Sequence, residues 1–235
     1  MRSLQRLRTL PMRAPQMRPR PRRRPDVPLR VPPGRMGRLW LRERLVVAGR
    51  AADLLEQKRQ ALRGEAGRLG HLAQDTRSRW EDACREAETW LLRAAMVGGE
   101  RQFGVVEAHL GGASEARIVW HSTMGLAYPW EAECALAPPV DVAGFGETSA
   151  LRYTIEAHRT ALVAAVEHAA AQRAFELVSA ELEVTTHRLR AIERRWVPRL
   201  EAALDEVEQR LEERERENVV RARRAAQGRP ESVAT

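Results

Sequence analysis

The sequence predicts a mainly α-helical protein, built as a long antiparallel two-helix coiled coil that is bent near Pro198 and carries a small hairpin or globular region in its middle. The first observation is that two stretches have apolar residues spaced three and four apart, with a glycine-rich region between them. The second is that none of the 13 prolines lies between Gly34 and Tyr128. The third is the low aromatic content, 5% of 235 residues, which suits a rod better than one large globular core.

Residues 1–33 alternate arginine with proline, and this composition predicts a disordered extension. The segment contains ten arginines and a single acidic residue, so the net charge of +8 comes from it and the rest of the chain is nearly neutral. A folded nucleic-acid binder would carry positive charge on the fold itself, so direct nucleic-acid binding is not expected. We interpret the segment as a non-essential extension, with a polyanion-binding arm and an organelle-targeting peptide as alternatives.

Residues 34–97 are predicted to form the first coiled-coil helix. From Leu45 to Val97, fourteen of sixteen seam positions are apolar, and a helix over this stretch is about 80 Å long, too long for a compact domain. The polar seam residues are Arg59 and Thr76. Arg59 either tolerates a wet boundary or fixes the helix register by reaching a carboxylate on the returning helix, where we expect it opposite residues 196–203.

Residues 98–150 are predicted to form a compact middle region, because they hold eight of the fifteen glycines and break the helical spacing. Residues 116–123 and 130–136 read as two short strands, with a turn over residues 124–129 between them. We therefore expect a small hairpin that caps the rod between the two long helices.

Residues 151–226 are predicted to form the second coiled-coil helix, with Thr148 or Ser149 as its N-cap. The apolar register shifts by one residue after Trp196, next to Pro198, whose missing N–H interrupts a helix. We expect the rod to bend or unwind there. Residues 227–235 are expected to form a flexible tail, and both chain ends should meet at one tip of the rod.

No pattern of residues indicates a catalytic, cofactor-binding or metal site. Lys58 is the only lysine and follows no glycine-rich nucleotide-binding loop. The six histidines lack metal-ligand spacing, and Cys84 and Cys134 are too few for a thiolate site. Neither a run of about 20 apolar residues nor a secretory signal is visible. We expect a soluble chain without a transmembrane segment.

Three C-terminal segments, residues 186–193, 197–201 and 213–218, closely resemble the D subunit of the vacuolar/archaeal-type rotary ATPases. That family has T-R-R-V-N-A-L-E, I-P-R-L-E and E-R-E-N in the same order and spacing. Residues 33–36 and the Met-Gly pair at 124–125 are similar to its opening and central segments, whereas His187, Arg190 and Gly34 depart from it. The structural and partner-contact candidates are Arg59, Met124, Gly125, Pro129, Pro198, Arg199, Leu200, Glu201, Glu215, Arg216 and Glu217.

The resemblance implies a non-catalytic central-stalk rotor subunit of a V-type or A-type ATP synthase or ATPase. Its paired termini would enter a hexamer of catalytic and nucleotide-binding large subunits, and its middle region would lie near the small F subunit of the rotor and the socket subunit that joins the membrane ring. Rotation would then couple ATP synthesis or hydrolysis to proton or sodium ion transport. The implied location is cytoplasmic, in the peripheral V1/A1-type sector.

Two other classes of function stay open on the sequence. One is a coiled-coil scaffold or adaptor whose basic N-terminal arm binds nucleic acid or an anionic surface, in which case binding should weaken steeply with salt. The other is a free-standing enzyme, for which no residue pattern speaks.

Overall fold

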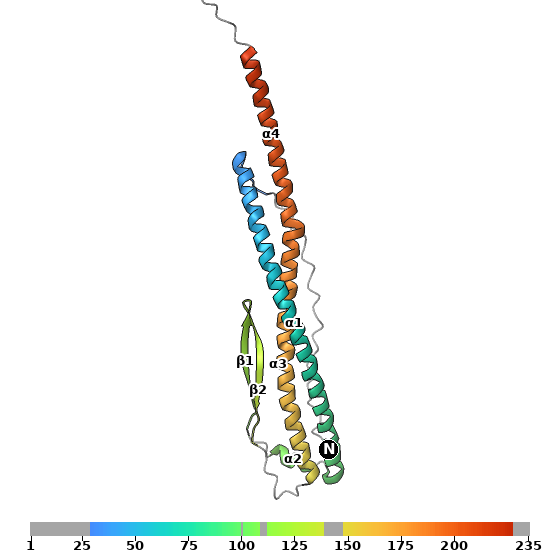
Figure 1. Ribbon diagram of the computed structural model, residues 1–235. Coiled ribbons are helices and arrows are strands. Elements are labelled where there is room, and N and C mark those ends of the chain that lie inside the picture. Colours follow the sequence, from blue (N-terminus) through green and yellow to red (C-terminus); the bar gives the residue numbers. More distant parts are fainter. Residues whose placement is uncertain (1–28, 100, 109–111, 139–147, 228–235) are drawn as a thin grey trace, which may run out of the picture.

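The protein is a long rod made of two antiparallel helical segments with a β-hairpin at its side (Figure 1). The computed structural model describes residues 29–99, 101–108, 112–138 and 148–227. In chain order the elements are α1 (Arg35–Gly98), α2 (Arg101–Ala108), β1 (Glu115–Thr123), β2 (Leu126–Ala135), α3 (Ser149–Ala191), the π-helical turn η1 (Ile192–Trp196) and α4 (Val197–Gln227). The predicted mainly α-helical, two-helix architecture is confirmed. The expected tail beyond Gln227 and the first 28 residues lie outside the described residues.

The seam predicted on α1 is the face that packs against the returning helix. Every seam position from Leu45 to Ala94 is buried or partly buried, and only Val97 is exposed, at 68%. Many of the buried positions are alanines, which allow two helix axes to approach closely. The heptad spacing therefore correctly identified the packed face along nearly the whole helix.

Ion pairs between α1 and the returning helix establish the antiparallel arrangement. As the partner on α1 moves toward the C-terminus, the partner on the second helix moves toward the N-terminus. The pairs are Arg35 with Glu215 (3.4 Å), Arg42 with Glu208 (2.7 Å), Lys58 with Glu181 (2.7 Å) and Arg79 with Glu167 (3.2 Å). We call the end with Arg35 the tip and the opposite end the base.

The structure corrects the expected location of Arg59. Its neighbour Lys58 reaches Glu181, and the charge of Glu193 on the returning helix contributes to the raised pKa of Arg59. Both carboxylates precede residues 196–203, where the sequence placed the partner. The expected residues 196–203 lie too close to the C-terminus. Because α4 continues beyond the start of α1, each residue of α1 lies opposite an earlier residue of the returning helix than the sequence suggested.

Three buried apolar clusters lie along the described part of the rod, and each joins α1 to the returning helix. The tip cluster contains Leu41, Ala48, Leu200 and Val207. The middle cluster contains Leu62, Ala66, Leu69, Tyr128, Ala174 and Val178. The base cluster contains Ala87, Ala157 and Ala161.

The returning helix changes its winding at η1. The N–H of Val197 donates to the carbonyl of Ile192, five residues back instead of four, which inserts one extra residue into the helix. This insertion accounts for the one-residue register shift after Trp196, because it returns Leu200 to the seam, where it is fully buried. The expected bend or unwinding beside Pro198 thus takes the form of a π-turn.

Helix α3 begins at one of its two expected caps. The N–H of Leu151 donates to Oγ1 of Thr148 at 3.2 Å. The Thr148 hydroxyl also donates to the side-chain oxygen of Gln102 at 3.3 Å, and the amide nitrogen of Gln102 donates to the carbonyl of Ala94. The short helix α2, which the sequence did not predict, is therefore tied to both long helices at the base.

The hairpin has a tighter turn than expected. Met124 and Gly125 alone connect β1 to β2, and their φ angles are +52° and +78°. Two-residue turns that match the right-handed twist of a hairpin favour positive φ angles of this kind. The expected turn over residues 124–129 is therefore too long. Pro129 lies within β2 opposite Trp120, where the strand register shifts, a position at which a missing N–H is tolerated.

The hairpin also lies in a different place from the cap that the sequence suggested. It runs along the side of α1 and α3, with its turn directed toward the middle of the rod (Figure 1). Tyr128 of β2 is 1% exposed and belongs to the middle cluster. An aromatic residue in a strand that is otherwise mostly exposed thus anchors the hairpin to the coiled coil.

Candidate functional site

The rod presents separate surfaces at its tip, side and base. Within the described residues, no group of three or more His, Cys, Asp or Glu side chains could hold a metal ion. None of the helices in this part of the chain is both long and apolar enough to span a membrane.

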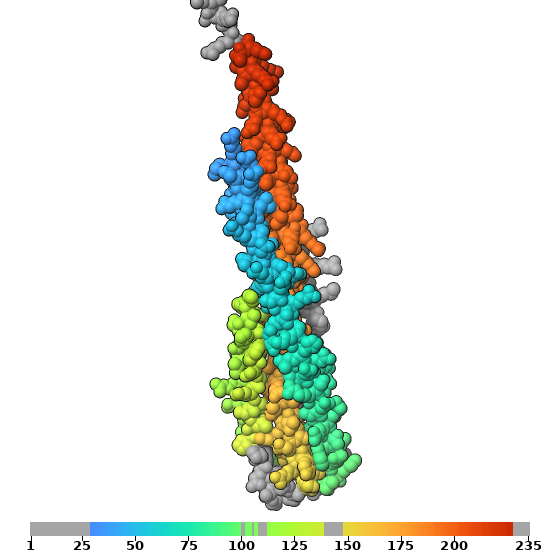
Figure 2. All heavy atoms as spheres, viewed as in Figure 1, coloured from blue at the N-terminus to red at the C-terminus, as the bar shows by residue number. Residues whose placement is uncertain are grey.

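The tip is formed mainly by α4. Beyond the Arg35–Glu215 pair, α4 continues without α1 to Gln227, a projection of about 18 Å (Figure 2). The candidates Glu215, Arg216 and Glu217 lie where this projection starts, and all three are exposed. Arg216 pairs with Glu212 at 3.5 Å and Glu217 with Arg221 at 3.2 Å, so the surface carries ion pairs within the helix.

The candidates near the bend lie directly after η1. Pro198 is the second residue of α4 and is exposed, as is Glu201. Arg199 is partly buried, whereas Leu200 is fully buried in the tip cluster. This group combines one core residue with a proline at the start of α4.

The candidates in the hairpin lie far from the other two groups along the rod. Met124 is 54% exposed at the turn, and Pro129 is buried against the coiled coil. The structure therefore does not bring the candidate residues into one site. Apart from Arg59 in the middle of α1, they mark three regions: the hairpin, the bend and the tip.

Arg59 forms its ion pair within its own helix. Its guanidinium donates to Glu56 Oε1 at 2.8 Å, and its side chain is 36% exposed. This hydrogen bond is the main reason why the pKa of Arg59 is raised, and the charge of Glu193 is a minor contribution. The geometry fits a polar seam residue at a wet boundary.

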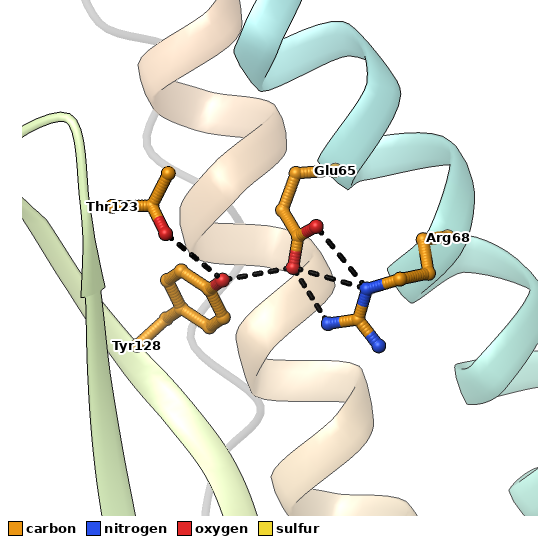
Figure 3. A network of polar contacts seen from close by, with 4 residues as sticks. All are labelled: Glu65, Arg68, Thr123 and Tyr128. Carbon is orange, nitrogen blue, oxygen red and sulfur yellow. Dashed lines mark hydrogen bonds and ion pairs between the residues drawn. The ribbon is translucent and has the colours of Figure 1, made fainter.

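A polar network that the sequence analysis did not find fixes the hairpin to α1 (Figure 3). The hydroxyl of Tyr128 donates to Glu65 Oε1 at 2.8 Å, and Arg68 donates to the same oxygen at 2.6 Å. The hydroxyl of Thr123 lies 3.4 Å from that of Tyr128. The Glu65–Arg68 pair could have been read from its i, i+3 spacing, but nothing in the sequence links it to Tyr128.

The protonation states in this network favour the observed bonds. The hydrogen bond from Arg68 is the main cause that lowers the pKa of Glu65, which keeps it a carboxylate that accepts both bonds. Burial is the main cause that raises the pKa of Tyr128, so its hydroxyl stays protonated and donates. The Arg68 guanidinium also lies 4.6 Å from the centre of the Trp130 ring, which adds a cation–π contact to the hairpin.

The base exposes apolar side chains. The last turns of α1 carry Leu92, Met96 and Val97, exposed by 64%, 86% and 68%. Beside them is a cavity of about 540 Å³ between α1, α2 and α3. Its apolar lining includes Leu91, Phe103, Val106, Leu151, Ile155 and Leu162. We call the exposed residues Leu92, Met96 and Val97 the base patch.

A long two-helix rod with distinct surfaces at its ends and side defines a stalk-like structural subunit. The family model that describes the D subunit of ATP synthase matches residues 39–227. The chain therefore belongs to the family of ATP synthase D subunits. This membership confirms the assignment to a non-catalytic central-stalk subunit of a rotary ATPase.

Individual relatives resemble the chain over most of its length. It is 31% identical over 209 residues to the V-type ATP synthase D subunit of Anaeromyxobacter sp., which covers 88% of this chain and 97% of the relative. It is 33% identical over 198 residues to the A-type ATP synthase D subunit of Methanopyrus kandleri, with 83% and 84% covered. The V-type ATP synthase D subunit of Thermus thermophilus is 31% identical over 201 residues, with 83% and 86% covered.

Proposed function

We propose that this chain is the rotor shaft between a catalytic hexamer and a membrane ring that moves protons or sodium ions. The shaft transmits rotation, which couples ATP synthesis or hydrolysis to ion transport, while nucleotides bind and react on the large subunits. The chain then belongs to the peripheral V1/A1-type sector of the complex. The observation that carries the proposal is the chemical difference between the two ends of the rod: a slender charged tip and an apolar base.

The tip is the end that we assign to the hexamer. All residues from Glu212 to Gln227 are exposed, and most are charged or small. Exposed ion pairs contribute little to stability and exchange readily with water. A surface of this kind allows a shaft to turn inside a cavity without being held by one large apolar contact.

The base is the end that we assign to the socket subunit joining the membrane ring. Parts of a rotor that turn together need a lasting interface, and lasting interfaces are more apolar than transient ones. The base patch and the adjacent apolar cavity meet this need. Apolar side chains of the socket subunit would cover Met96 and its neighbours.

The side of the hairpin is the surface that we assign to the small F subunit of the rotor. Ile118, Val119 and Trp120 of β1 are 44%, 43% and 58% exposed. They lie on the strand that is farther from α3, since the contacts of the hairpin with α3 are made through β2. These apolar side chains at the side of the rod offer a partner a surface that leaves tip and base free.

Truncation of α4 tests the role of the tip. Removal of residues 214–235 from the assembled complex should lower ion-driven ATP synthesis in vesicles several-fold, because it shortens the part of the shaft inside the hexamer. Nucleotide affinity of the hexamer should not change. The matched control is removal of residues 228–235, which leaves α4 whole. Full synthesis with the long truncation would contradict the torque role of the tip, and lost nucleotide binding would contradict the assignment of the nucleotide sites to other chains.

Crosslinking tests the orientation of the rod. In the assembled complex, Met96→Cys should crosslink to the socket subunit and Val220→Cys to the large subunits. The unmodified chain, with its partly buried Cys84 and Cys134, is the control for background products. Products with the opposite partners would reverse the proposed orientation.

A further inference from the structure

Residues 29–34 fold back over the rod just before α1 begins. We infer that this segment is a strap that clamps α1 to α4 at the tip cluster. The inference goes beyond the proposed rotor function, because a shaft of two helices does not require a third chain segment at this level.

Apolar contacts anchor the strap to both helices. Leu29 and Val31 are partly buried and pack against the tip cluster, which contains Leu41 of α1 and Leu200 of α4. Val31 and the two prolines that follow also line a hollow of about 170 Å³ with Val207 and Leu211 of α4. Residues 29–33 therefore belong to the packed structure, which limits the predicted disordered extension to earlier residues.

Gly34 reverses the chain between the strap and α1. Its φ of +73° with ψ of −151° lies in a region that is essentially open to glycine alone. The carbonyl of Gly34 then accepts the N–H of Gly37 at 3.1 Å, which starts the helix. The strap thus runs toward the tip, and α1 runs back from it.

Gly37 gives the strap the room that it needs. A Cβ atom at this position would lie 2.1 Å from the carbonyl oxygen of Pro32 and 3.1 Å from Cγ1 of Val31. The first atom belongs to the backbone, so it cannot move away without lifting the strap. The close contact is specific to this packing, because the three nearest atoms to that Cβ all belong to strap residues.

The strap lies along the side of the rod and not on the projecting tip. Leu29 packs against the tip cluster beside α1 and α4, whereas Gly34 lies directly before the first residue of α1. The projecting part of α4, from Glu215 to Gln227, stays uncovered by the strap.

A pair of glycine substitutions in two chain lengths tests the strap. Gly37→Ala should lower the melting temperature of the full chain, because the new methyl group collides with the strap. In a chain that starts at Gly34, the same substitution should raise it by about 2–4 °C, because alanine favours the helix and the obstacle is gone. The control is Gly49→Ala in the same helix, which has no atom within 4 Å and should raise the melting temperature in both chains.

The outcomes separate the strap from other effects of the glycine. A higher melting temperature for Gly37→Ala in both chains would overturn the strap, since no collision would exist. A lower melting temperature in both chains would also overturn it, since the cost would then come from packing between α1 and α4. Removal of residues 1–33 should lower the melting temperature of the unsubstituted chain, whereas removal of residues 1–28 should leave it unchanged.

Discussion

The tip section and the middle section of the rod cover their seams with different third segments. In the middle, Leu62 and Leu69 pack beside Ala174, and Tyr128 of the hairpin covers them from the side. At the tip, Leu41 and Leu200 fill the seam, and Leu29 and Val31 cover it. The comparison indicates that two helices alone leave one side of the seam open, and that each section uses a third chain segment to close it.

At the base, the described third segment is α2, which Gln102 ties to both long helices but which leaves a cavity between itself and them. The base cluster has three buried alanines, and Leu92, Met96 and Val97 beyond it are exposed. A difference of this kind is expected if the tip and middle sections are complete within the chain while the base is completed by a partner. Substitutions in the two completed sections can break or sharpen this contrast.

The largest expected effect is loss of a leucine from the tip cluster. Leu200→Ala should lower the free energy of unfolding by about 3 kcal/mol, because the side chain is fully buried and would leave a cavity. The control is Leu54→Ala, which is 66% exposed and should change it by less than about 0.5 kcal/mol. Urea denaturation of the isolated chain measures both. Equal effects would show that the tip cluster is not a core.

A smaller effect is expected where the hairpin attaches to the middle section. Tyr128→Phe should cost about 1 kcal/mol, because it keeps the ring but removes the hydrogen bond to Glu65. Amide hydrogen exchange of β2 should detect faster opening. The matched control is Tyr153→Phe, whose ring is 56% exposed and stacks on Trp90. If both variants open equally, the hydrogen bond does not hold the hairpin.

The same attachment should respond to acid. The pKa of Glu65 is lowered in the folded chain from an ordinary value near 4.5, so its contribution is fully present above that value and is lost as the pH falls through the lowered pKa. Stability should therefore decrease in acid, and less so in Glu65→Gln. The free energy of unfolding measured between about pH 6 and pH 3 compares the two chains. Parallel curves would exclude Glu65 from the acid response.

The smallest effect is expected for an ion pair that lies along the rod between the tip cluster and the middle cluster. Lys58 and Glu181 are 2.7 Å apart and about a quarter exposed, so water screens their attraction. A double-mutant cycle with Lys58→Met and Glu181→Gln should give a coupling of about 0.5 kcal/mol that weakens with salt. A coupling that is several times larger and insensitive to salt would mean that the pair is effectively buried.

The long helices could be predicted from sequence because their determinants are local and periodic. Heptad spacing identified the seam of α1, Thr148 was identified as a cap, and the register shift beside Pro198 corresponds to η1. The position of the hairpin could not be predicted in this way. Its attachment depends on Tyr128 and Glu65, which are 63 residues apart and share no repeat.

The strap and the residues that lie opposite Arg59 were missed for a related reason. The proline and arginine composition of residues 1–33 predicts disorder, so Leu29 and Val31 could not be recognised as apolar anchors from sequence. Their contacts depend on the folded tip cluster. Which residues of the returning helix lie opposite Arg59 depends on the offset between the two helices. That offset is set by how far α4 continues beyond α1, a quantity that no local pattern contains.

The extra residue in η1 has a consequence for the angle between the two halves of the rod. Each residue turns a helix by about 100°. Because of the inserted residue, the face of α4 that continues a given face of α3 differs by about 100° from the face that an uninterrupted helix would present. The hairpin is attached beside α3, and the projecting tip belongs to α4. The π-turn therefore sets the rotational phase of the tip relative to the hairpin, and deletion of one residue there would turn one against the other or expel Leu200 and Val207 from the seam.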